Sequence, residues 1–215
     1  MDQKQMVAVP TLAQEVYSRL RENIMNGDFS PGEKISIRKI AERYAVSTMP
    51  VREALNKLQS EGFVHFERRS IYVSQLSSKD LIEIFKIRMN LEEMAMEWSY
   101  PNIGENELIE LTKLVKEMDD KIDSPIEWNV LNKQFHTKIY SYSHSKPMLE
   151  ILNAVWGRVE PYMNIYAASA YHLSLSQKEH GQMIEYMAKK EWDRLQALTS
   201  DHIQKTCHAI LEKLP

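Results

Sequence analysis

Residues 37–64 read IRKIAERYAVSTMPVREALNKLQSEGFV, and this stretch decides the fold of the first part of the chain. The apolar residues Ile37, Ile40 and Ala41 predict a short helix that ends around Tyr44. A break of three residues follows, and then a longer apolar pattern begins. The spacing therefore indicates two consecutive helices joined by a tight turn.

The second of these helices has distinct inner and outer faces. Ser47 is placed to cap its N-terminus, and Pro50 falls in the first turn, where a missing N–H costs little. The inner stripe at i, i+3, i+4, i+7 consists of Val51, Ala54, Leu55 and Leu58. The outer face presents Thr48, Met49, Arg52 and Asn56, with Lys57 at its margin. Two short helices, the second polar and cationic outside, predict a helix-turn-helix.

The flanking segments extend this motif. Upstream, a residue at every fourth position from Leu12 to Ile24 is apolar, which predicts a helix ending at Asn26-Gly27, and FSPGEKIS (residues 29–36) is expected to be a turn. Downstream, VHF and IYV are short strand candidates around a turn that carries Arg68 and Arg69. We interpret this hairpin as a wing, and residues 1–75 as a winged helix-turn-helix DNA-binding domain.

Residues 76–215 are expected to form an all-α bundle, so the fold class of the chain is mainly α. Helical periodicity predicts helices at about 78–99, 104–122, 125–142, 146–169, 174–190 and 191–213. The breaks between them fall at Pro101, Ser124-Pro125, Ser145-Lys146-Pro147 and Tyr171-His172, while the last two helices nearly abut. The chain has no Gly-rich phosphate loop, G-x-S-x-G elbow or H-E-x-x-H motif, so we expect no enzyme.

Composition narrows the class of protein further. Residues 1–75 hold 11 Lys and Arg against 9 Asp and Glu, whereas residues 76–215 hold 16 against 21. This asymmetry fits a mildly basic, polyanion-binding part on an acidic body. The single cysteine, Cys207, excludes an internal disulfide. Because no apolar run is long enough to span a membrane and MDQKQMVAVP lacks the layout of a signal peptide, we expect a cytoplasmic protein.

Three histidines of the second part face inward. His136, His180 and His202 each lie on the apolar stripe of a different predicted helix, and Asn132 precedes His136 by one turn. A single inward histidine is usually a hydrogen-bonded core residue, but three with an oxygen donor favour a divalent transition metal: Zn²⁺, Ni²⁺, Mn²⁺ or Fe²⁺. The remaining histidines of this part are expected at the surface: His144, His172 and His208.

The first part closely resembles the DNA-binding segment of the GntR superfamily of bacterial transcription regulators, through AxxxxVSxxPVREALxxLxxxG. The resemblance implies that Arg38 contacts bases and that Arg52 fixes the recognition helix on DNA. Both roles suit a planar guanidinium. Many relatives have arginine where this chain has Thr48, so one base contact is lost or replaced by contact with a thymine methyl. The wing carries Ser70 after Arg69, where relatives usually have glycine.

The second part resembles the FCD ligand-binding domain of the FadR branch, in its six-helix, VanR-like form. The resemblance rests on NLEEMAMEWS (residues 90–99), NKQFHTKIY (132–140) and SQKEHGQMIEYMAKKEWDRLQALTSDHI (176–203). It implies a metal held by an aspartate and three histidines, matching Asn132, His136, His180 and His202. The amide of Asn132 carries no charge, so metal affinity should be weaker than with a carboxylate. It also implies that Arg88, which its helical register places at least at the edge of the inner face, helps to bind a carboxylate effector.

These observations predict a homodimeric transcription regulator, expected to be a repressor, on an inverted-repeat operator in double-stranded DNA. A small organic acid at a metal-containing site would control its affinity for DNA. Two alternatives stay open: a metal-sensing regulator without an organic effector, and a zinc-dependent hydrolase with Glu179 as base. The hydrolase leaves the helix-turn-helix unexplained.

Overall fold

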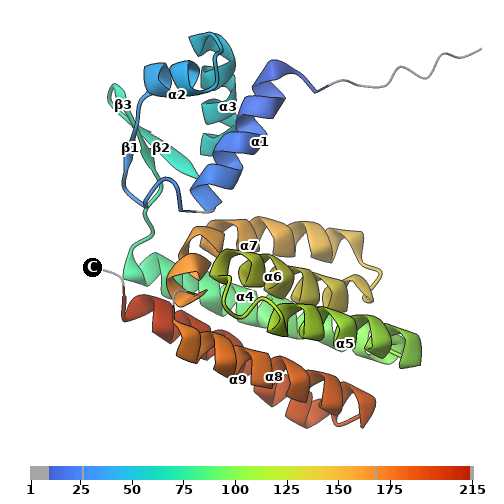
Figure 1. Cartoon of the computed structure of the whole chain (residues 1–215). Helices are drawn as coiled ribbons and strands as arrows, with labels where there is room; N and C mark the ends of the chain where they lie inside the picture. The colour runs from blue at the N-terminus through green and yellow to red at the C-terminus, as the bar shows by residue number, and fades with distance from the viewer. Residues whose placement is uncertain (1–9, 26, 168, 214–215) are drawn as a thin grey trace, which may run out of the picture. The chain divides into compact units, whose positions relative to one another are not determined.

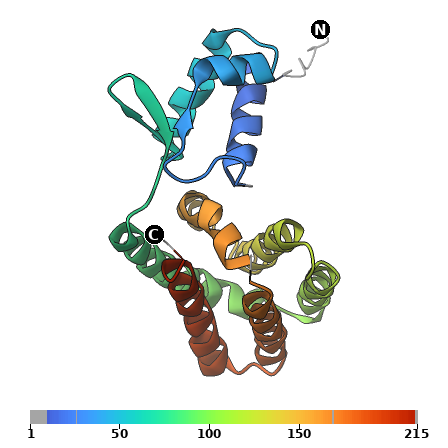
Figure 2. The same ribbon diagram turned by 60° about the vertical axis from the view of Figure 1, so that its left-hand side comes forward.

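The computed structural model describes residues 10–25, 27–167 and 169–213, so Asn26 of the predicted helix end and residues 1–9 lie outside the described residues. The chain divides into two compact units, Met1–Gln75 and Leu76–Pro215 (Figures 1 and 2). Each has its own hydrophobic interior.

The first unit is built on three helices. They are α1 (Leu12–Met25), α2 (Ile37–Arg43) and α3 (Thr48–Ser60). Helix α1 packs against α3, and α2 packs against α3 across the tight turn. The predicted inner stripe of α3 is confirmed, because Val51, Ala54, Leu55 and Leu58 are all buried. Gly62, with φ +81°, lets the chain leave α3 and enter the next strand.

A three-stranded antiparallel sheet completes this unit. Its strands are β1 (Lys34–Ile35), β2 (Val64–Glu67) and β3 (Ser70–Val73), in the order β1-β3-β2. The hairpin pairs Val64 with Val73 and Glu67 with Ser70, as the wing requires. The expectation that residues 29–36 form only a turn is wrong, because Lys34 and Ile35 pair with β3. A strand of two residues is too short to show a period in the sequence.

The second unit is all-helical, as predicted. Its elements are α4 (Ser78–Ser99), a 3₁₀ turn (Tyr100–Asn102), α5 (Glu105–Asp119), α6 (Pro125–Ser141), α7 (Lys146–Ala167), α8 (Ala170–Ala188) and α9 (Trp192–Leu211). Helix α4 packs against α6, α7 and α9, and α8 packs against α5 and α9. Figure 1 shows these helices packed together, and α8 and α9 are in contact.

Capping residues explain where these helices begin. Ser77 and Asp80 form a reciprocal capping box at the start of α4, and Ser124-Pro125 opens α6. The predicted break at Tyr171-His172 is wrong. Helix α8 starts four residues before the predicted position, because Ser169 caps it by accepting a hydrogen bond from the backbone N–H of His172.

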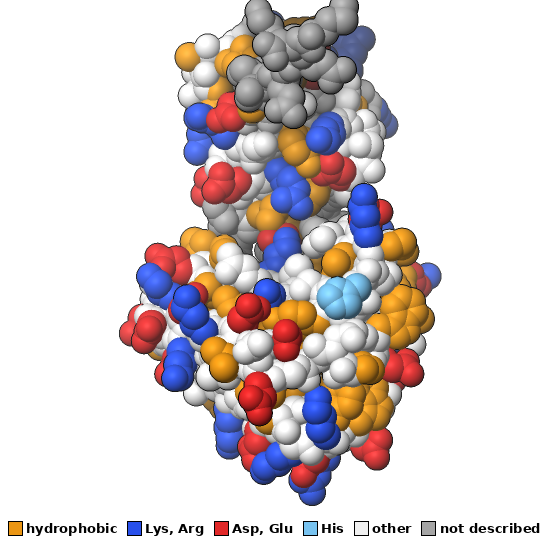
Figure 3. Space-filling view, turned by 90° about the vertical axis from the view of Figure 1, so that its right-hand side faces the viewer, with side chains coloured by type: hydrophobic (Ala, Val, Ile, Leu, Met, Phe, Trp, Pro, Cys, Tyr) orange, Lys and Arg blue, Asp and Glu red, His pale blue; other side chains and the backbone are white. Residues whose placement is uncertain are grey.

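The interior of the second unit contains many buried polar side chains. Among the described residues they all lie on α4, α6, α8 and α9: Arg88, Glu92, Ser99, Asn132, His136, Ser176, Glu179, His180, Thr199, His202 and Thr206. Because buried polar groups are costly unless they are paired or bind something, this concentration marks a candidate site. At the surface seen in Figure 3, side chains of both charges are interspersed with hydrophobic ones. Within the described residues, no helix has the length and apolar character to cross a membrane.

Candidate DNA-binding surface and buried histidine site

The predicted DNA-contacting face of α3 is exposed. Its side chains are Ser47, Thr48, Met49, Arg52 and Asn56, and Met49 is 63% exposed. The face lies opposite the buried stripe, so the core holds α3 while its outer side chains stay in solvent. This is the geometry that allows a helix to enter a DNA groove.

Ser47 lies at the predicted N-cap position of α3 but forms no capping hydrogen bond. Ser47 occupies the N-cap position with an extended backbone, but its side chain accepts no hydrogen bond from the first turn of α3. Its hydroxyl is therefore free of a capping role. A helix N-terminus with free N–H groups attracts anions, so this end of α3 is suited to a DNA phosphate.

Four arginines complete the exposed cationic surface. Arg38 lies in the first turn of α2 and Arg52 on α3, while Arg68 and Arg69 form the turn between β2 and β3. All four are exposed. None of them forms an ion pair among the described residues. None of the described carboxylates therefore competes with a polyanion for these guanidinium groups.

The three predicted histidines meet inside the second unit. His136 comes from α6, His180 from α8 and His202 from α9, and one ring nitrogen of each lies within 4.8 Å of the others. All three are buried, with exposures of 2%, 0% and 6%. The structure therefore brings together side chains that are up to 66 positions apart in the sequence.

The protonation of the cluster suits a metal ion. Burial lowers the pKa of His136 and His180 well below 6.5, and the neighbouring His202 lowers both further. Both imidazoles are therefore neutral at pH 7, which is the form that binds metals.

Unpartnered atoms around the cluster support the same interpretation. Neither ring nitrogen of His180 has a hydrogen-bond partner among the described residues, and neither does Oδ1 of Asn132, one turn before His136. Orphaned buried polar atoms of this kind are rare in folded proteins. A divalent transition metal would bind Oδ1 of Asn132 and one ring nitrogen of His180, so the residues present fit such an ion.

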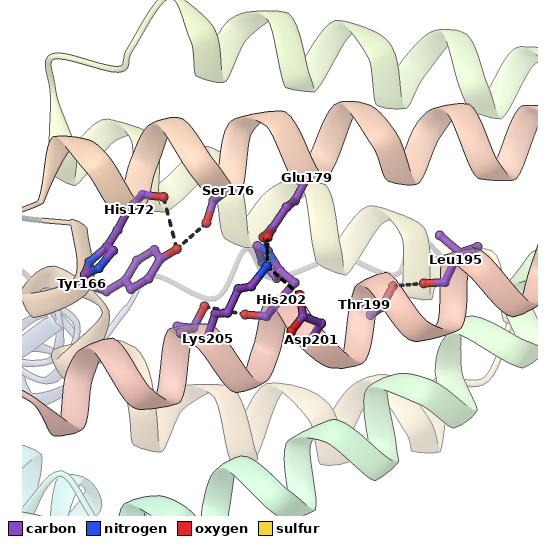
Figure 4. A network of polar contacts seen from close by, with 10 residues as sticks. Tyr166, His172, Ser176, Glu179, Leu195, Thr199, Asp201, His202 and Lys205 are labelled. Atoms are coloured by element: carbon purple, nitrogen blue, oxygen red, sulfur yellow. Dashed lines mark hydrogen bonds and ion pairs between the residues drawn. The ribbon is translucent and has the colours of Figure 1, made fainter.

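A carboxylate holds the third histidine in place. Glu179 accepts hydrogen bonds through Oε2 from Nδ1 of His202, at 2.7 Å, and through Oε1 from Lys205, at 2.8 Å (Figure 4). Although burial opposes ionisation, these bonds hold the pKa of Glu179 below its usual value. Because Nδ1 is occupied, Nε2 of His202 is the nitrogen free for a ligand.

Arg88 lies on the inner face of α4, as its helical register predicted. It is 3% exposed, and its Nε donates to Oε1 of Glu92 at 2.8 Å. Its guanidinium carbon lies 4.1 Å from the ring centroid of Trp156, and Nη1 has no hydrogen-bond partner among the described residues. Glu92, one turn on, offsets the charge of Arg88 and so permits its burial.

A second chain of contacts joins Arg88 to the histidines. The Tyr140 hydroxyl donates to Oε2 of Glu92 at 2.6 Å and lies 3.4 Å from Nδ1 of His136. Arg88 itself contributes to lowering the pKa of His136. The expected effector residue and the expected metal ligands therefore belong to one connected site.

Comparison with known proteins identifies both units. Residues 12–73 match the family of bacterial regulatory proteins named gntR, and residues 83–205 match the FCD domain. The chain belongs to the GntR family and carries an FCD domain.

Relatives of this GntR-family chain are transcription regulators. It is 28% identical over 197 residues to the HTH-type transcriptional regulator YdhC of Bacillus subtilis (strain 168), which covers 90% of this chain and 88% of YdhC. It is 29% identical over 162 residues to the gluconate operon transcriptional repressor of the same organism, covering 74% and 65%. The structure of E. coli McbR/YncC has the same fold, with a TM-score of 0.80, 21% identity and coverage of 95% and 99%.

These findings make the GntR-family chain a DNA-binding transcription regulator and not an enzyme. The hydrolase alternative also fails at the proposed base. Glu179 is buried, and both of its oxygens are bound, one to His202 and one to Lys205. A carboxylate held in this way positions a histidine and is not free to activate water.

The remaining histidines of the second unit lie outside the cluster. His144 and His208 are exposed, as predicted. His172, also expected at the surface, is half-buried, because its ring stacks on Tyr166 with centroids 5.1 Å apart. Tyr166 in turn donates to the backbone carbonyl of His172 and contacts Ser176 (Figure 4).

Sequence reasoning missed the supporting residues of the site. Glu92 follows Arg88 by four positions on a helix, a spacing that signals an ion pair. Glu179 and His202 are on different helices and 23 positions apart, and no local pattern connects them. The role of Tyr140 likewise depends on how α4 and α6 pack.

Proposed function

We propose that this regulator is a homodimeric repressor whose affinity for DNA is controlled by a small carboxylate bound at a divalent metal in the FCD domain. The observation that supports the proposal most strongly is the buried cluster of His136, His180 and His202, beside the unpartnered Oδ1 of Asn132. A structural core would pair these atoms with each other or with the backbone.

Four side chains would hold the ion. His136, His180 and His202 supply imidazole nitrogens, and Asn132 supplies an amide oxygen. This donor set suits Zn²⁺, Ni²⁺, Mn²⁺ or Fe²⁺. When bound, such an ion supplies a Lewis acid with positions left for an oxygen ligand of the effector.

Arg88 supports the carboxylate part of the proposal. Its Nε is bound to Glu92, but Nη1 is buried and without a partner among the described residues. A guanidinium N–H is a strong donor to a carboxylate oxygen. One end of a small acid would therefore accept a hydrogen bond from Arg88 near the histidine cluster.

Because Arg88 lies on α4, this helix would transmit effector binding to the DNA-binding unit. Strand β3 of the wing ends at Val73, and α4 begins at Ser78. The backbone N–H of Leu76 within this short connection donates to the hydroxyl of Tyr162 on α7, at 2.6 Å. A ligand that moves α4 would therefore act directly on the segment that leads into the wing.

Dimerisation is supported by an exposed apolar stripe on α4. Ile87, Leu91, Met94 and Trp98 recur at i, i+4, i+7 and i+11 along one side of the helix. Ile87, Met94 and Trp98 are 51%, 41% and 46% exposed. A stripe of this kind is typical of a protein interface, and a second copy of the chain would place a second recognition helix on an inverted repeat.

The test measures DNA binding by the purified full-length protein. An operator is first selected from random duplexes, and its dissociation constant is then measured with metal-loaded and chelator-stripped protein across a panel of small organic acids. We expect at least one acid to weaken DNA binding of loaded protein by about 5- to 150-fold, and no acid to act on stripped protein. If metal alone releases the DNA and no acid adds to it, the metal-sensing alternative holds instead.

A further inference from the structure

We infer that a divalent cation and a carboxylate bind the histidine site cooperatively, each strengthening the binding of the other, because Asn132 leaves the protein's own donor atoms without negative charge. The inference rests on the proposed function and specifies how its two ligands depend on each other. It assigns to Asn132 the dependence of metal binding on carboxylate binding, and of carboxylate binding on metal binding.

The donor atoms themselves are uncharged. The ligand nitrogens of His136, His180 and His202 lie within 4.8 Å of one another in a buried space, and a histidine ring that binds a metal through one nitrogen contributes no negative charge. Oδ1 of Asn132 belongs to a neutral amide. A divalent ion among these four donors would therefore keep both of its positive charges uncompensated.

The two carboxylates nearest the cluster do not remedy this deficit. Glu92 is fully buried and pairs with Arg88 at 2.8 Å. Glu179 is 4% exposed and pairs with Lys205, also at 2.8 Å. Glu92 faces Arg88, and Glu179 already accepts hydrogen bonds from His202 and Lys205, so neither carboxylate is free to join the donor atoms as a ligand.

Because the site is buried, the missing negative charge opposes the binding of a metal ion on its own. Leaving an uncompensated charge in a low-dielectric interior is strongly unfavourable. A carboxylate that enters with the ion supplies negative charge and also accepts a hydrogen bond from the free Nη1 of Arg88. Conversely, a carboxylate that enters without the ion faces three uncharged imidazole donors, so its own negative charge is balanced less well.

Each ligand should therefore strengthen the binding of the other, and by thermodynamic linkage the two enhancements must be equal. Acetate and acetamide separate the effect of charge from that of shape, because they have nearly the same size and differ in charge. The first experiment titrates Ni²⁺, and separately Zn²⁺, into chelator-stripped full-length protein by calorimetry. It is run in plain buffer, in saturating acetate and in the same concentration of acetamide.

For the unaltered protein we expect acetate to lower the dissociation constant of the metal by about ten-fold or more, and acetamide by less than about two-fold. The reverse titration, acetate into metal-loaded protein, should show the same factor. The thermal midpoint should rise clearly only when metal and acetate are both present.

Asn132→Asp tests the assigned residue. It places a carboxylate among the donors, so metal should bind tightly in plain buffer and the enhancement by acetate should fall below about two-fold. Asn153→Asp is the matched control, because it adds the same charge at an exposed position of α7. The control should keep the full acetate effect.

The outcomes separate this inference from the proposed function. If the unaltered protein binds metal equally well with and without acetate, the pairing is overturned and the metal site stands. If neither ion binds under any condition, the proposed metal site and the pairing fail together. If Asn132→Asp does not fold, the comparison of acetate with acetamide on the unaltered protein still decides the question.

Discussion

Oε2 of Glu179 lies 2.7 Å from Nδ1 of His202, and both side chains are buried between α8 and α9. The carboxylate occupies Nδ1 of His202, so Nε2 is the ring nitrogen left for a ligand. Lys205, one turn after Asp201, holds the other oxygen of Glu179 and pairs with Asp201 at 2.6 Å. The third histidine is thus oriented before any ligand binds, which lowers the entropy cost of binding.

We expect Glu179→Gln to weaken metal binding. The amide removes the negative charge that raises the basicity of His202, and loss of such a partner typically costs 10- to 100-fold, so the metal dissociation constant should rise by about that factor. Calorimetric titration with Zn²⁺ in saturating acetate measures it. Glu185→Gln, at an exposed position of the same helix, is the control and should leave the constant unchanged. Equal affinities for both variants would remove the positioning role of Glu179.

Replacing Arg38 and replacing Arg52 should weaken DNA binding in different ways. Arg52→Ala, if Arg52 binds phosphate, should weaken binding to all duplexes and reduce the slope of log affinity against log salt by about one unit. Arg38→Ala, if Arg38 reads a base, should cost about 1–3 kcal/mol on the selected operator only. Anisotropy titrations at several salt concentrations measure both. Arg194→Ala, exposed in the FCD domain, is the control. Unchanged binding by both variants would contradict the predicted contacts.

The apolar stripe of α4 should hold a dimer. Light scattering of the ligand-free protein at micromolar concentration should give about twice the chain mass of 25.2 kDa. Replacing both Ile87 and Trp98 by glutamate places four like charges across a two-fold interface, so it should yield monomers and a large loss of operator affinity. Ile109→Glu, at a site 67% exposed on α5, should remain dimeric. A dimeric double variant would exclude this face as the interface.

The free energy of unfolding at alkaline pH should depend on the hydrogen bonds between Tyr17 and Glu61 in the DNA-binding unit. The Tyr17 hydroxyl donates to both oxygens of Glu61, and partial burial together with this carboxylate raises the pKa of Tyr17 from 10.0 to about 12. Between these values the unfolded chain loses the proton and the folded chain keeps it. This contribution to stability is therefore complete below pH 10 and is lost as the pH rises to about 12.

Tyr17→Phe should remove that part of the pH dependence. Chemical unfolding of both proteins between pH 9 and about 12 should show a shallower decline for the variant, by about 1 kcal/mol after solvent screening is allowed for. Tyr171→Phe, at an exposed position, should follow the unaltered protein. Parallel curves for Tyr17→Phe and the unaltered protein would mean that Glu61 does not restrain the hydroxyl.

Much of the fold follows from local sequence pattern. The predicted bounds of α4 agree with the structure to the residue, because Ser77 caps one end and Pro101 lies just beyond the other. The helices of the DNA-binding unit were predictable for the same reason. Local pattern failed for β1, which exists only because β3 is available to pair with it, and for the start of α8 at Ser169.

The sequence by itself determined which side chains face inward, because a period of 3.6 residues sorts each helix into a core face and a solvent face. It therefore identified His136, His180, His202 and Asn132 as a possible site. Only the tertiary structure decided that the three rings meet within 4.8 Å and that Glu179 supports His202. It also decided that Arg88 is buried against Glu92 and Trp156. These relationships depend on how helices that are far apart in the sequence pack against each other. The residue pattern within one helix does not indicate where the neighbouring helix lies.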